Sequence, residues 1–383
     1  MDFSLTKEQV ELKEEYKIFA QKEIAPIAFD VDEKAQFSFD SLKKLAEIGF
    51  LGLVYPKEYG GQGKTLLEAI IAVEELAKEC PSTTLSCGVS STLFAYHIFN
   101  FGTNAQKEKY IPKVIKGEII GAWALTEPEA GSDAASITTT AVKKNGNYII
   151  NGTKIFISNA PIANVVIVMA KTDPEKGARG ISAIIVEKDA PGFNKGITLD
   201  KMGFRGLQVG ELIFENCTVS EENLLGKEGL GFLQAMKVLE QGRVAVAGVG
   251  VAIAQACLEE SVTRSNKRIQ FGKPISNFQL IQQKLADMKA RIDASRLLTY
   301  KAACLISNKK PCAVESSVAK LFSTETANFC ANEAVQIFGG YGYIKKYKDR
   351  YKIERMYRDA KLLEIVEGTS EVQRMIISRH LTR

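Results

Sequence analysis

The sequence predicts a mainly α-helical protein with a β domain in the middle, and three observations support this fold class. Apolar residues recur at helical spacing among Lys and Glu side chains in residues 1–122. β-branched runs and turn dipeptides dominate residues 123–226. The helical period returns in residues 227–383, in stretches long enough to pack side by side. We therefore expect an N-terminal helical domain, a middle antiparallel β-barrel or sheet and a C-terminal four-helix bundle, divided at these boundaries.

The same patterns predict the individual elements. Helical periodicity is clearest in six segments, which we predict as helices: 7–22, 41–48, 65–78, 230–263, 280–307 and 313–338. β-branched residues concentrate in three segments, which we predict as strands: 164–170, 181–186 and 211–214. Asn-Gly pairs at 145–146 and 151–152 indicate turns between strands. No helical pattern alternates with the strands, so a parallel βαβ fold is not expected.

Composition excludes several classes of protein. The chain has 383 residues, of which 45% are hydrophobic and 25% charged, so it can bury a large core. Its seven cysteines are odd in number, widely spaced and without a C-x-x-C pair, which argues against a disulfide framework or a zinc site. The only two histidines, His97 and His380, argue against a histidine metal site or a Ser-His-Asp triad. We expect no metal.

Charge and hydropathy bear on partners and location. The net charge of +5 suits a polyphosphate ligand but falls short of the basic stripe that nucleic acid requires. No apolar run approaches the length that spans a bilayer, and the charged N-terminus does not resemble a secretory signal. We expect a cytoplasmic protein without a membrane span and without nucleic acid as a partner.

The segment 356–374 contains the strongest candidate for chemistry. Glu367 precedes Gly368 and Thr369, which form a turn, and apolar residues at helical spacing follow. A carboxylate on a turn before a helix can project into a cleft. The alternative is an acidic residue favoured by the positive end of the helix dipole, and local physics alone favours that alternative.

Two further segments could face a flat or carbonyl-rich ligand. The loop 124–133 could turn its backbone N–H groups and the hydroxyls of Thr126 and Ser132 toward one ligand, although an ordinary polar turn is equally consistent. The strand 154–160 places Phe156 and Ser158 on one face, which suits a heteroaromatic ring. Packing alone is the commoner reason for such a pair.

Two segments could bind phosphate. Arg268 lies in the basic stretch 264–274, where it could make bidentate contacts, unless that stretch is a solvated helix end. The glycines of 336–343 could admit a diphosphate or simply end a helix. The glycine-rich 226–231 lacks a βαβ context and is discounted as a dinucleotide fingerprint.

Together and in this order, these motifs resemble the acyl-CoA dehydrogenase family, nearly from end to end. The resemblance is carried by seven segments: 55–63, 125–133, 154–159, 264–274, 336–343, 357–360 and 367–374. The short-chain, butyryl-type branch is the most similar, particularly in 336–342 and 367–373.

The resemblance implies FAD held between the subunits of a homotetramer. The residues that match the family's flavin contacts are Leu125, Thr126, Gly131, Ser132, Phe156 and Ser158. Those that match positions clasping the adenylate end from a neighbouring subunit are Arg268, Gln270, Phe271, Gln336, Gly339 and Gly340. Thr369 and Glu371 also match FAD-contacting positions.

The same resemblance implies an acyl-CoA substrate and its binding residues. Arg243 matches a CoA-binding position, and so does Glu240, where the family more often has Asp. Family members place the catalytic base either where Glu367 stands or just before the helix arginine. The second position is Gly242 here, so Glu367 is the single candidate base. Ser132, Val366 and Gly368 are also expected near the substrate.

The implied reaction removes two hydrogens in concert. Glu367 would take the α-proton while the β-hydride passes to flavin N5. The family stabilises the developing enolate with the backbone N–H at the Glu367 position and a ribityl hydroxyl. Bound substrate would expel water and raise the pKa of the carboxylate. The electrons would then pass to an electron-transfer flavoprotein.

Departures from the family pattern bear on the acyl group. Val366 stands where tyrosine is usual in the short-chain branch, which should leave room for a branched or cyclic acyl group. The stretch 80–106 lacks Asp, Glu, Lys and Arg, and the family uses it to floor the acyl pocket. The expected liners there are Thr84, Cys87, Gly88 and Ser91. A dicarboxyl substrate would leave a buried charge unpaired and is disfavoured.

Other readings remain open. The same fold could work as an oxidase or as an enoyl-CoA reductase, or could act specifically on a cyclohexanecarboxyl-type thioester. A non-enzymatic assembly partner is disfavoured by the intact Glu367 and the complete flavin motifs.

Overall fold

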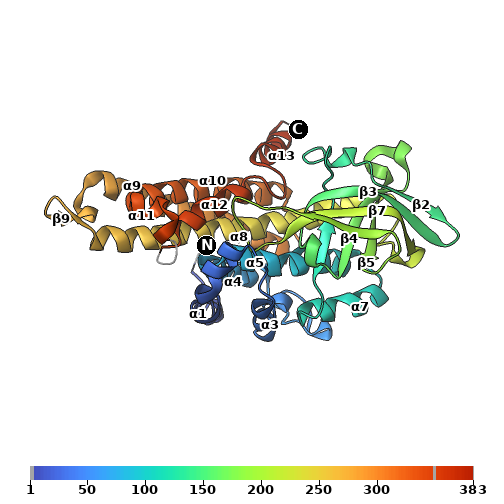
Figure 1. Ribbon diagram of the computed structural model, residues 1–383, viewed down its shortest axis with the longest axis horizontal. Coiled ribbons are helices and arrows are strands. Elements are labelled where there is room, and N and C mark those ends of the chain that lie inside the picture. Colours follow the sequence, from blue (N-terminus) through green and yellow to red (C-terminus); the bar gives the residue numbers. More distant parts are fainter. Residues whose placement is uncertain (1–3, 348–350, 383) are drawn as a thin grey trace.

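The structure is a computed structural model that describes residues 4–347 and 351–382. It is elongated, with long helices at one end and the strands at the other (Figure 1). The shorter N-terminal helices lie along one side of the molecule in this view. The expectation about the chain's N-terminus rests partly on residues 1–3, which lie outside the described residues.

The N-terminal part consists of seven α-helices. They are α1 (Lys7–Phe19), α2 (Ala28–Lys34), α3 (Phe39–Glu47), α4 (Leu66–Glu79), α5 (Pro81–Val89), α6 (Tyr96–Phe101) and α7 (Asn104–Ile115). Thr6, Thr65 and Thr103 begin α1, α4 and α7 with capping boxes, in which the threonine hydroxyl and a Gln or Glu three residues later satisfy each other's backbone N–H groups. The predicted helix 65–78 is therefore confirmed to within one residue. The predicted helix 7–22 continues beyond α1 as a π-helical turn, Ala20–Ile24.

The middle part is one seven-stranded sheet. Its strands are β1 (Gly121–Ala124), β2 (Thr140–Lys144), β3 (Asn147–Ser158), β4 (Val165–Lys171), β5 (Ile181–Glu187), β6 (Phe193–Thr198) and β7 (Val209–Ser220). They follow the order β1-β4-β2-β3-β7-β6, with β5 paired to β4. Asn145 and Gly146 form the β2–β3 turn with φ angles of 50° and 75°, the left-handed conformation that an Asn-Gly turn predicts.

The expected antiparallel sheet is confirmed for most strand pairs but is wrong for two pairings of β4. β1 and β4 pair in parallel, with Gly121 opposite Val165, and β2 also meets β4 in parallel at Thr140. In the sequence, the whole β2–β3 hairpin separates β1 from β4. A connection of that length can bring the chain back in the same direction, so the two strands can pair in parallel. No α-helix stands between β1 and β4, as the absence of βαβ patterning predicted.

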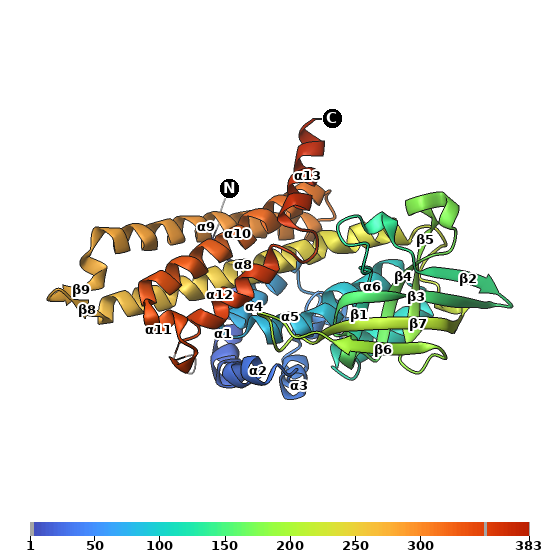
Figure 2. The same cartoon turned by 45° about the horizontal axis from the view of Figure 1, so that its top comes forward.

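The C-terminal part contains the long helices. The elements are α8 (Gly231–Lys267), β8 (Ile269–Gln270), β9 (Lys273–Pro274), α9 (Gln279–Ser307), α10 (Ala313–Phe338), α11 (Gly340–Tyr343), α12 (Ile353–Leu363) and α13 (Ser370–Leu381). α8, α9 and α10 run side by side, and α13 projects from the bundle (Figure 2). The predictions of 280–307 and 313–338 are confirmed almost to the residue, since a period of 3.6 sustained over many turns leaves little freedom in the assignment.

Helix α8 contradicts one expectation from the sequence. By length and composition alone it is apolar enough to cross a membrane, so the statement that no run approaches that length is wrong. However, 78% of its apolar window is buried inside the fold. The other helices surround α8, whose central run of Ala, Gly and Val lets them approach closely.

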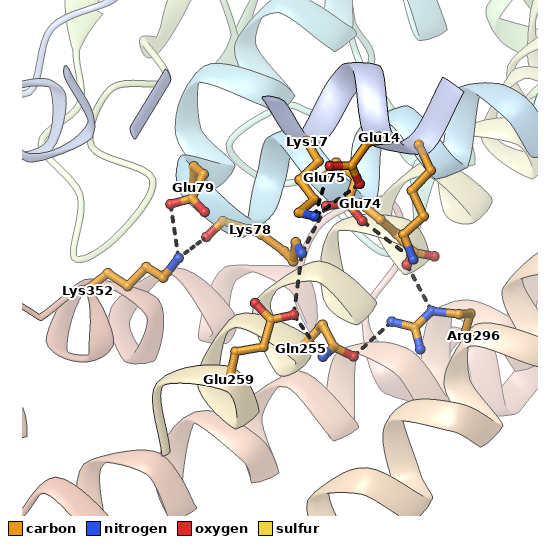
Figure 3. A network of polar contacts seen from close by, with 11 residues as sticks. Glu14, Lys17, Glu74, Glu75, Lys78, Glu79, Gln255, Glu259, Arg296 and Lys352 are labelled. Carbon is orange, nitrogen blue, oxygen red and sulfur yellow. Dashed lines mark hydrogen bonds and ion pairs between the residues drawn. The ribbon is translucent and has the colours of Figure 1, made fainter. Parts of the chain in front are cut away.

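A polar network fixes the N-terminal helices to the bundle (Figure 3). Glu74 on α4 accepts a hydrogen bond of 3.0 Å from Arg296 on α9, and Arg296 donates to Gln255 on α8 at 3.0 Å. Lys78 on α4 lies 3.4 Å from Glu259 on α8. Because Glu74 is buried, loss of its arginine partner would leave an uncompensated charge, so the network specifies how the two helical layers meet.

The 357–360 motif joins three parts of the chain. Arg358 on α12 makes a bidentate pair with Asp32 on α2, at 2.9 and 2.6 Å. The neighbouring Asp359 accepts from the backbone N–H of Phe204, which lies in the loop before β7. These contacts make the motif a structural junction between α12, the N-terminal helices and the β domain.

Candidate functional site

Glu367 lies on the turn between α12 and α13 and points into the bundle. Its φ of 54° is in the left-handed region that non-glycine residues rarely adopt, and Gly368 follows at 93°. The carboxylate oxygen Oε2 is buried and has no hydrogen-bond partner among the described residues. A strained backbone that presents an unpaired buried carboxylate is typical of a functional group. Thr369 caps α13 instead, so the alternative reading of Glu367 as a helix-end acid does not describe it.

The carboxylate lies against Gly242 on α8. A Cβ atom at residue 242 would come within 1.9 Å of Glu367 Oε2 and 2.7 Å of its Cδ. Glycine at this position is therefore what leaves room for the carboxylate. The two positions at which family members place their base, expected from the sequence to be alternatives, meet at one point in space.

Three side chains surround the turn that presents Glu367. Arg243 Nε donates to the Glu367 carbonyl at 3.4 Å. Lys320 Nζ on α10 donates to the Gly368 carbonyl at 2.9 Å, and Gln373 Nε2 donates to the same carbonyl at 2.8 Å. All three side chains are buried. Of these three residues, only Arg243 was expected at the site from the sequence; Lys320 and Gln373 were not. Lys320 could have been noticed in the sequence as a lysine at a position where the helical pattern of α10 predicts a buried side chain.

The surroundings make Glu367 a base near neutral pH. Burial raises the pKa of Glu367 to about 7, and the charges of Arg243 and Lys320 oppose a further rise. Burial lowers the pKa of Lys320 to about 8, against the opposing effect of Glu367. A carboxyl group with a pKa near the working pH suits proton abstraction from carbon.

The loop 125–132 and strand β3 are held together by a buried ion pair. Lys154 donates to Glu127 at 2.7 Å and to the Leu125 carbonyl at 2.9 Å. Glu127 accepts in turn from the backbone N–H groups of Thr138 and Thr139. The pair therefore fixes the loop relative to the strand that carries Phe156. This brace was not foreseen from the sequence.

The residues expected at the flavin differ in exposure: Leu125 is buried, Thr126 is half-buried and the others are at least partly exposed. The Thr126 carbonyl accepts from the Ile155 N–H at 3.0 Å, whereas Gly131 and Ser132 are exposed. Phe156 lies on a β-bulge with φ 59° and is 63% exposed, and Ser158 is half-buried. The bulge interrupts the simple alternation predicted for 154–160. A large exposed aromatic ring on this strand fits a planar ring system such as the isoalloxazine of FAD.

The residues expected at the adenylate end gather at the far end of the bundle. A cavity of about 510 Å³ is lined by Arg264, Arg268, Gln270 and the chain from Gln336 to Tyr341. Cβ atoms added at Gly339 and Gly340 would meet nothing within 4 Å. Phe271, on the β8–β9 turn beside this cavity, is 93% exposed. Two arginines and open backbone suit a diphosphate.

The two halves of this cofactor site are far apart within one chain. Gly242, at the carboxylate, and Lys267, beside the cavity, are separated by 25 residues of the continuous helix α8, or about 37 Å at 1.5 Å per residue. Thr369 and Glu371 lie near the carboxylate end; Thr369 accepts from the Val372 N–H at 3.3 Å, and Glu371 is exposed in the first turn of α13.

The expected substrate residues have different environments. Glu240 is half-buried, one turn before Arg243, and pairs with Lys237 at 2.7 Å. Val366 is partly buried against the helical core, next to the carboxylate in sequence. These positions follow one face of α8 and the adjoining turn.

The expected acyl-pocket liners are mostly turned into the protein. Thr84 and Ser91 are buried, and their hydroxyls donate to the carbonyls of Cys80 and Leu51. Cys87 is fully buried. Only Gly88 borders free space, with nothing within 4 Å of an added Cβ. A pocket role for the other three stays a prediction.

Comparison with known proteins covers the whole architecture. Models of the N-terminal, middle and C-terminal domains of acyl-CoA dehydrogenases match residues 6–118, 122–217 and 229–382. A relative named acryloyl-CoA reductase (NADH), from Anaerotignum propionicum, is 46% identical, and the match covers 100% of this chain and 96% of the relative.

Solved structures agree with the sequence matches. The butyryl-CoA dehydrogenase of Megasphaera elsdenii has a TM-score of 0.96 and 43% identity, with 100% of each chain covered. A chain solved in work on the electron transferring flavoprotein of Acidaminococcus fermentans has a TM-score of 0.97 and 44% identity, again with 100% of each chain covered.

Proposed function

Because this chain belongs to the acyl-CoA dehydrogenase family, oxidoreductases that act on a CH–CH bond with FAD, we propose that it oxidises a short-chain or compact branched or cyclic acyl-CoA to the 2-enoyl-CoA. Glu367 is the base that removes the α-proton. The observation that carries the proposal is its buried, unpartnered Oε2 beside Gly242. Because no protein group donates a hydrogen bond to this oxygen, it is free to accept a proton from carbon.

The residues of this chain would divide the work of binding and proton removal. FAD supplies the acceptor for the hydride that leaves the β-carbon. Loop 125–132, Phe156 and Ser158 hold its ring system. Within the described residues the Glu367 backbone N–H donates to no acceptor, so it is available to the thioester oxygen, where enolate charge develops. Arg243 and Glu240 contact the CoA moiety.

A compact, uncharged acyl group is the best match to the pocket. Val366 is smaller than the tyrosine usual in the short-chain branch, and Gly88 borders open space. The stretch 80–106 offers no Lys or Arg to pair a distal carboxylate. Branched C4–C5 and cyclohexanecarboxyl thioesters therefore join butyryl-CoA as candidates, and dicarboxyl thioesters do not.

Anaerobic titration tests the substrate class. The holoenzyme is titrated with butyryl-, isobutyryl-, isovaleryl-, cyclohexanecarboxyl- and glutaryl-CoA while the flavin absorbance near 450 nm is followed. We expect bleaching by compact monocarboxyl thioesters and none by glutaryl-CoA. Val366→Tyr should favour butyryl-CoA over the branched and cyclic thioesters. Full bleaching by glutaryl-CoA alone would contradict the assignment.

A second candidate is the reverse reaction, reduction of an enoyl-CoA. The relative at 46% identity, named as an NADH-dependent acryloyl-CoA reductase, favours it. We propose an electron-transfer flavoprotein as the redox partner in either direction, since a similar solved chain comes from work on such a protein. Reoxidation of the substrate-reduced enzyme separates a third reading, an oxidase, from both directions: rapid peroxide formation in air indicates an oxidase, whereas slow reoxidation in air with fast transfer to the flavoprotein excludes it.

We also propose that the protein is a homotetramer. A separation of about 37 Å along α8 prevents one chain from clasping both ends of the same FAD, so the adenylate cavity would serve a neighbour's cofactor. Exposed apolar residues lie on the surfaces that could meet it, among them Ile269, Phe271, Leu280 and Leu297. Sedimentation of the holoenzyme should give four chains. A monomer that retains FAD would contradict this.

Two coarser proposals complete the description. The domains are divided as 1–122, 123–226 and 227–383, with the catalytic carboxylate in the last. The enzyme acts in the cytoplasm. Limited proteolysis of the holoenzyme should cut first near the two boundaries.

A further inference from the structure

Lys320 is a buried charged residue that no motif identified. It lies in the middle of α10 with no exposed surface, flanked by buried residues that are small or only weakly polar. A buried ammonium group is unfavourable unless an opposite charge and hydrogen bonds compensate it. Its hydrogen bond goes to the carbonyl of Gly368, directly after Glu367. The groups that compensate the charge of Lys320 must therefore lie in the turn that carries Glu367.

The geometry around the turn assigns Lys320 two effects. The carbonyl of Gly368 is clamped by Lys320 at 2.9 Å and by Gln373 at 2.8 Å. These two bonds hold Glu367 and Gly368 in left-handed conformations that would otherwise relax. Only one of the two donors is charged. Gln373 can restrain the backbone, whereas Lys320 can also act on the carboxylate through space.

We propose that Lys320 is a positioning residue for the reaction proposed above: it fixes the turn that presents Glu367 through its bond to the Gly368 carbonyl, and its positive charge favours the ionised form of the Glu367 carboxyl group. The inference rests on the proposed function. Lys320 would then touch neither substrate nor cofactor and would still set the pH range in which Glu367 is ionised and can accept a proton.

The other charged groups around the turn do not replace this charge. Arg243 and Glu240 face it from α8, with Glu240 already paired to Lys237. Glu364 at the end of α12 and Glu371 on α13 are like-charged with Glu367 and face Lys320. Without Lys320, Arg243 alone would oppose the effect of burial and of the neighbouring carboxylates.

The direction of the pH effect follows. Removal of Lys320 takes away a charge that favours the ionised form, so Glu367 should need a higher pH to lose its proton. Burial brings the pKa of Lys320 itself to about 8. The difference between the bleaching rates of the wild type and a variant without Lys320 should therefore be largest between about pH 6 and 8. Above that range the two enzymes should converge.

The test measures the rate of flavin bleaching by butyryl-CoA in anaerobic stopped flow, from pH 5.5 to 9, with the holoenzymes. Lys320→Met should move the midpoint of the rate profile upward from about pH 7 by about one pH unit, so that the rate at pH 7 falls about fivefold. Gln373→Met removes the neutral donor to the same carbonyl. It should slow bleaching at every pH without moving the midpoint. Lys301→Met, an exposed lysine on α9, should change neither.

An unmoved midpoint in Lys320→Met would overturn the proposal, and so would an equal shift in Gln373→Met, which would attribute the effect to loosening of the turn. If Lys320→Met gives no folded holoenzyme, Lys320→Arg is measured: retention of charge should keep the wild-type midpoint, and a large upward shift would count against the idea. Glu367→Gln is run alongside. Normal bleaching by that variant would refute the proposed reaction and this inference with it, whereas an inactive Glu367→Gln with an unmoved Lys320→Met midpoint would refute only the role of Lys320.

Discussion

Gly242→Ala should slow catalysis without destabilising helix α8. Alanine is favoured over glycine in a helix interior by up to about 1 kcal/mol, so an unobstructed site would gain stability. Here the new Cβ would come within 1.9 Å of Glu367 Oε2. Ordinary contact requires about 3.4 Å, so the carboxylate must retreat by about 1.5 Å or turn away. A misplacement of about 1 Å in a catalytic group can reduce a rate about 100-fold.

We therefore expect flavin bleaching by the best acyl-CoA to slow about 100-fold in Gly242→Ala, while the melting temperature and FAD content stay close to wild type. Gly248→Ala is the matched control on the same helix, where the new Cβ would lie 3.1 Å from Ile70 Cγ2 and at ordinary contact distance from Ile70 Cδ1 and Val73 Cγ1. That variant should keep its rate within a few-fold. Wild-type bleaching by Gly242→Ala would refute the placement of Glu367 beside α8.

Three further perturbations test the site from other directions. The folded-state pKa of Glu367, about 7, lies above the ordinary 4.5. Its contribution to stability is therefore fully present below pH 4.5 and is lost as pH rises through 7. In urea unfolding, Glu367→Gln should be more stable than wild type at pH 8, by at most about 3 kcal/mol, and equally stable near pH 4.5. Lys154→Met leaves Glu127 as an uncompensated buried carboxylate and should cost about 3–5 kcal/mol of stability together with FAD retention; an unchanged urea midpoint would exclude the brace. Arg268→Ala should weaken FAD binding about tenfold or more, measured by equilibrium dialysis, with FMN binding unaffected because FMN lacks the adenylate half; equal losses for FAD and FMN would contradict the assigned cavity.

The sequence predicted the elements whose signals are local. α9 and α10 were placed almost to the residue because their apolar period continues over many turns. Glu367 attracted notice because a turn, Gly368-Thr369, follows it directly, but local physics alone favoured a helix-end acid, and its role as the base came from the family resemblance. The turn of the β2–β3 hairpin was readable from the Asn-Gly pair at 145–146 because this signal is also local, whereas the turn expected at 151–152 is wrong because both residues lie within β3.

What the sequence did not predict depends on contacts between distant segments. The parallel pairing of β1 with β4 is a choice of partner, which neither strand's own pattern specifies. The bulge at Phe156 depends on the register of β3 against β7. Lys320 stands at a position where the helical pattern of α10 predicts core, but only the packing of the turn before α13 against α10 shows which group its ammonium meets. Gly242 was known from the sequence as the second family position for the base, but its contact with a carboxylate 125 positions later in the chain became visible only in the structure.

The measurement that most directly tests Glu367 as the base is single-turnover flavin reduction in the Glu367→Gln holoenzyme. The substitution keeps the size of the side chain and removes its ability to take a proton. We expect acyl-CoA to bind with near wild-type affinity while bleaching slows at least ~100-fold, the scale of a lost general base. Bleaching at the wild-type rate would mean that another group removes the α-proton, and the reaction proposed for this site would be wrong.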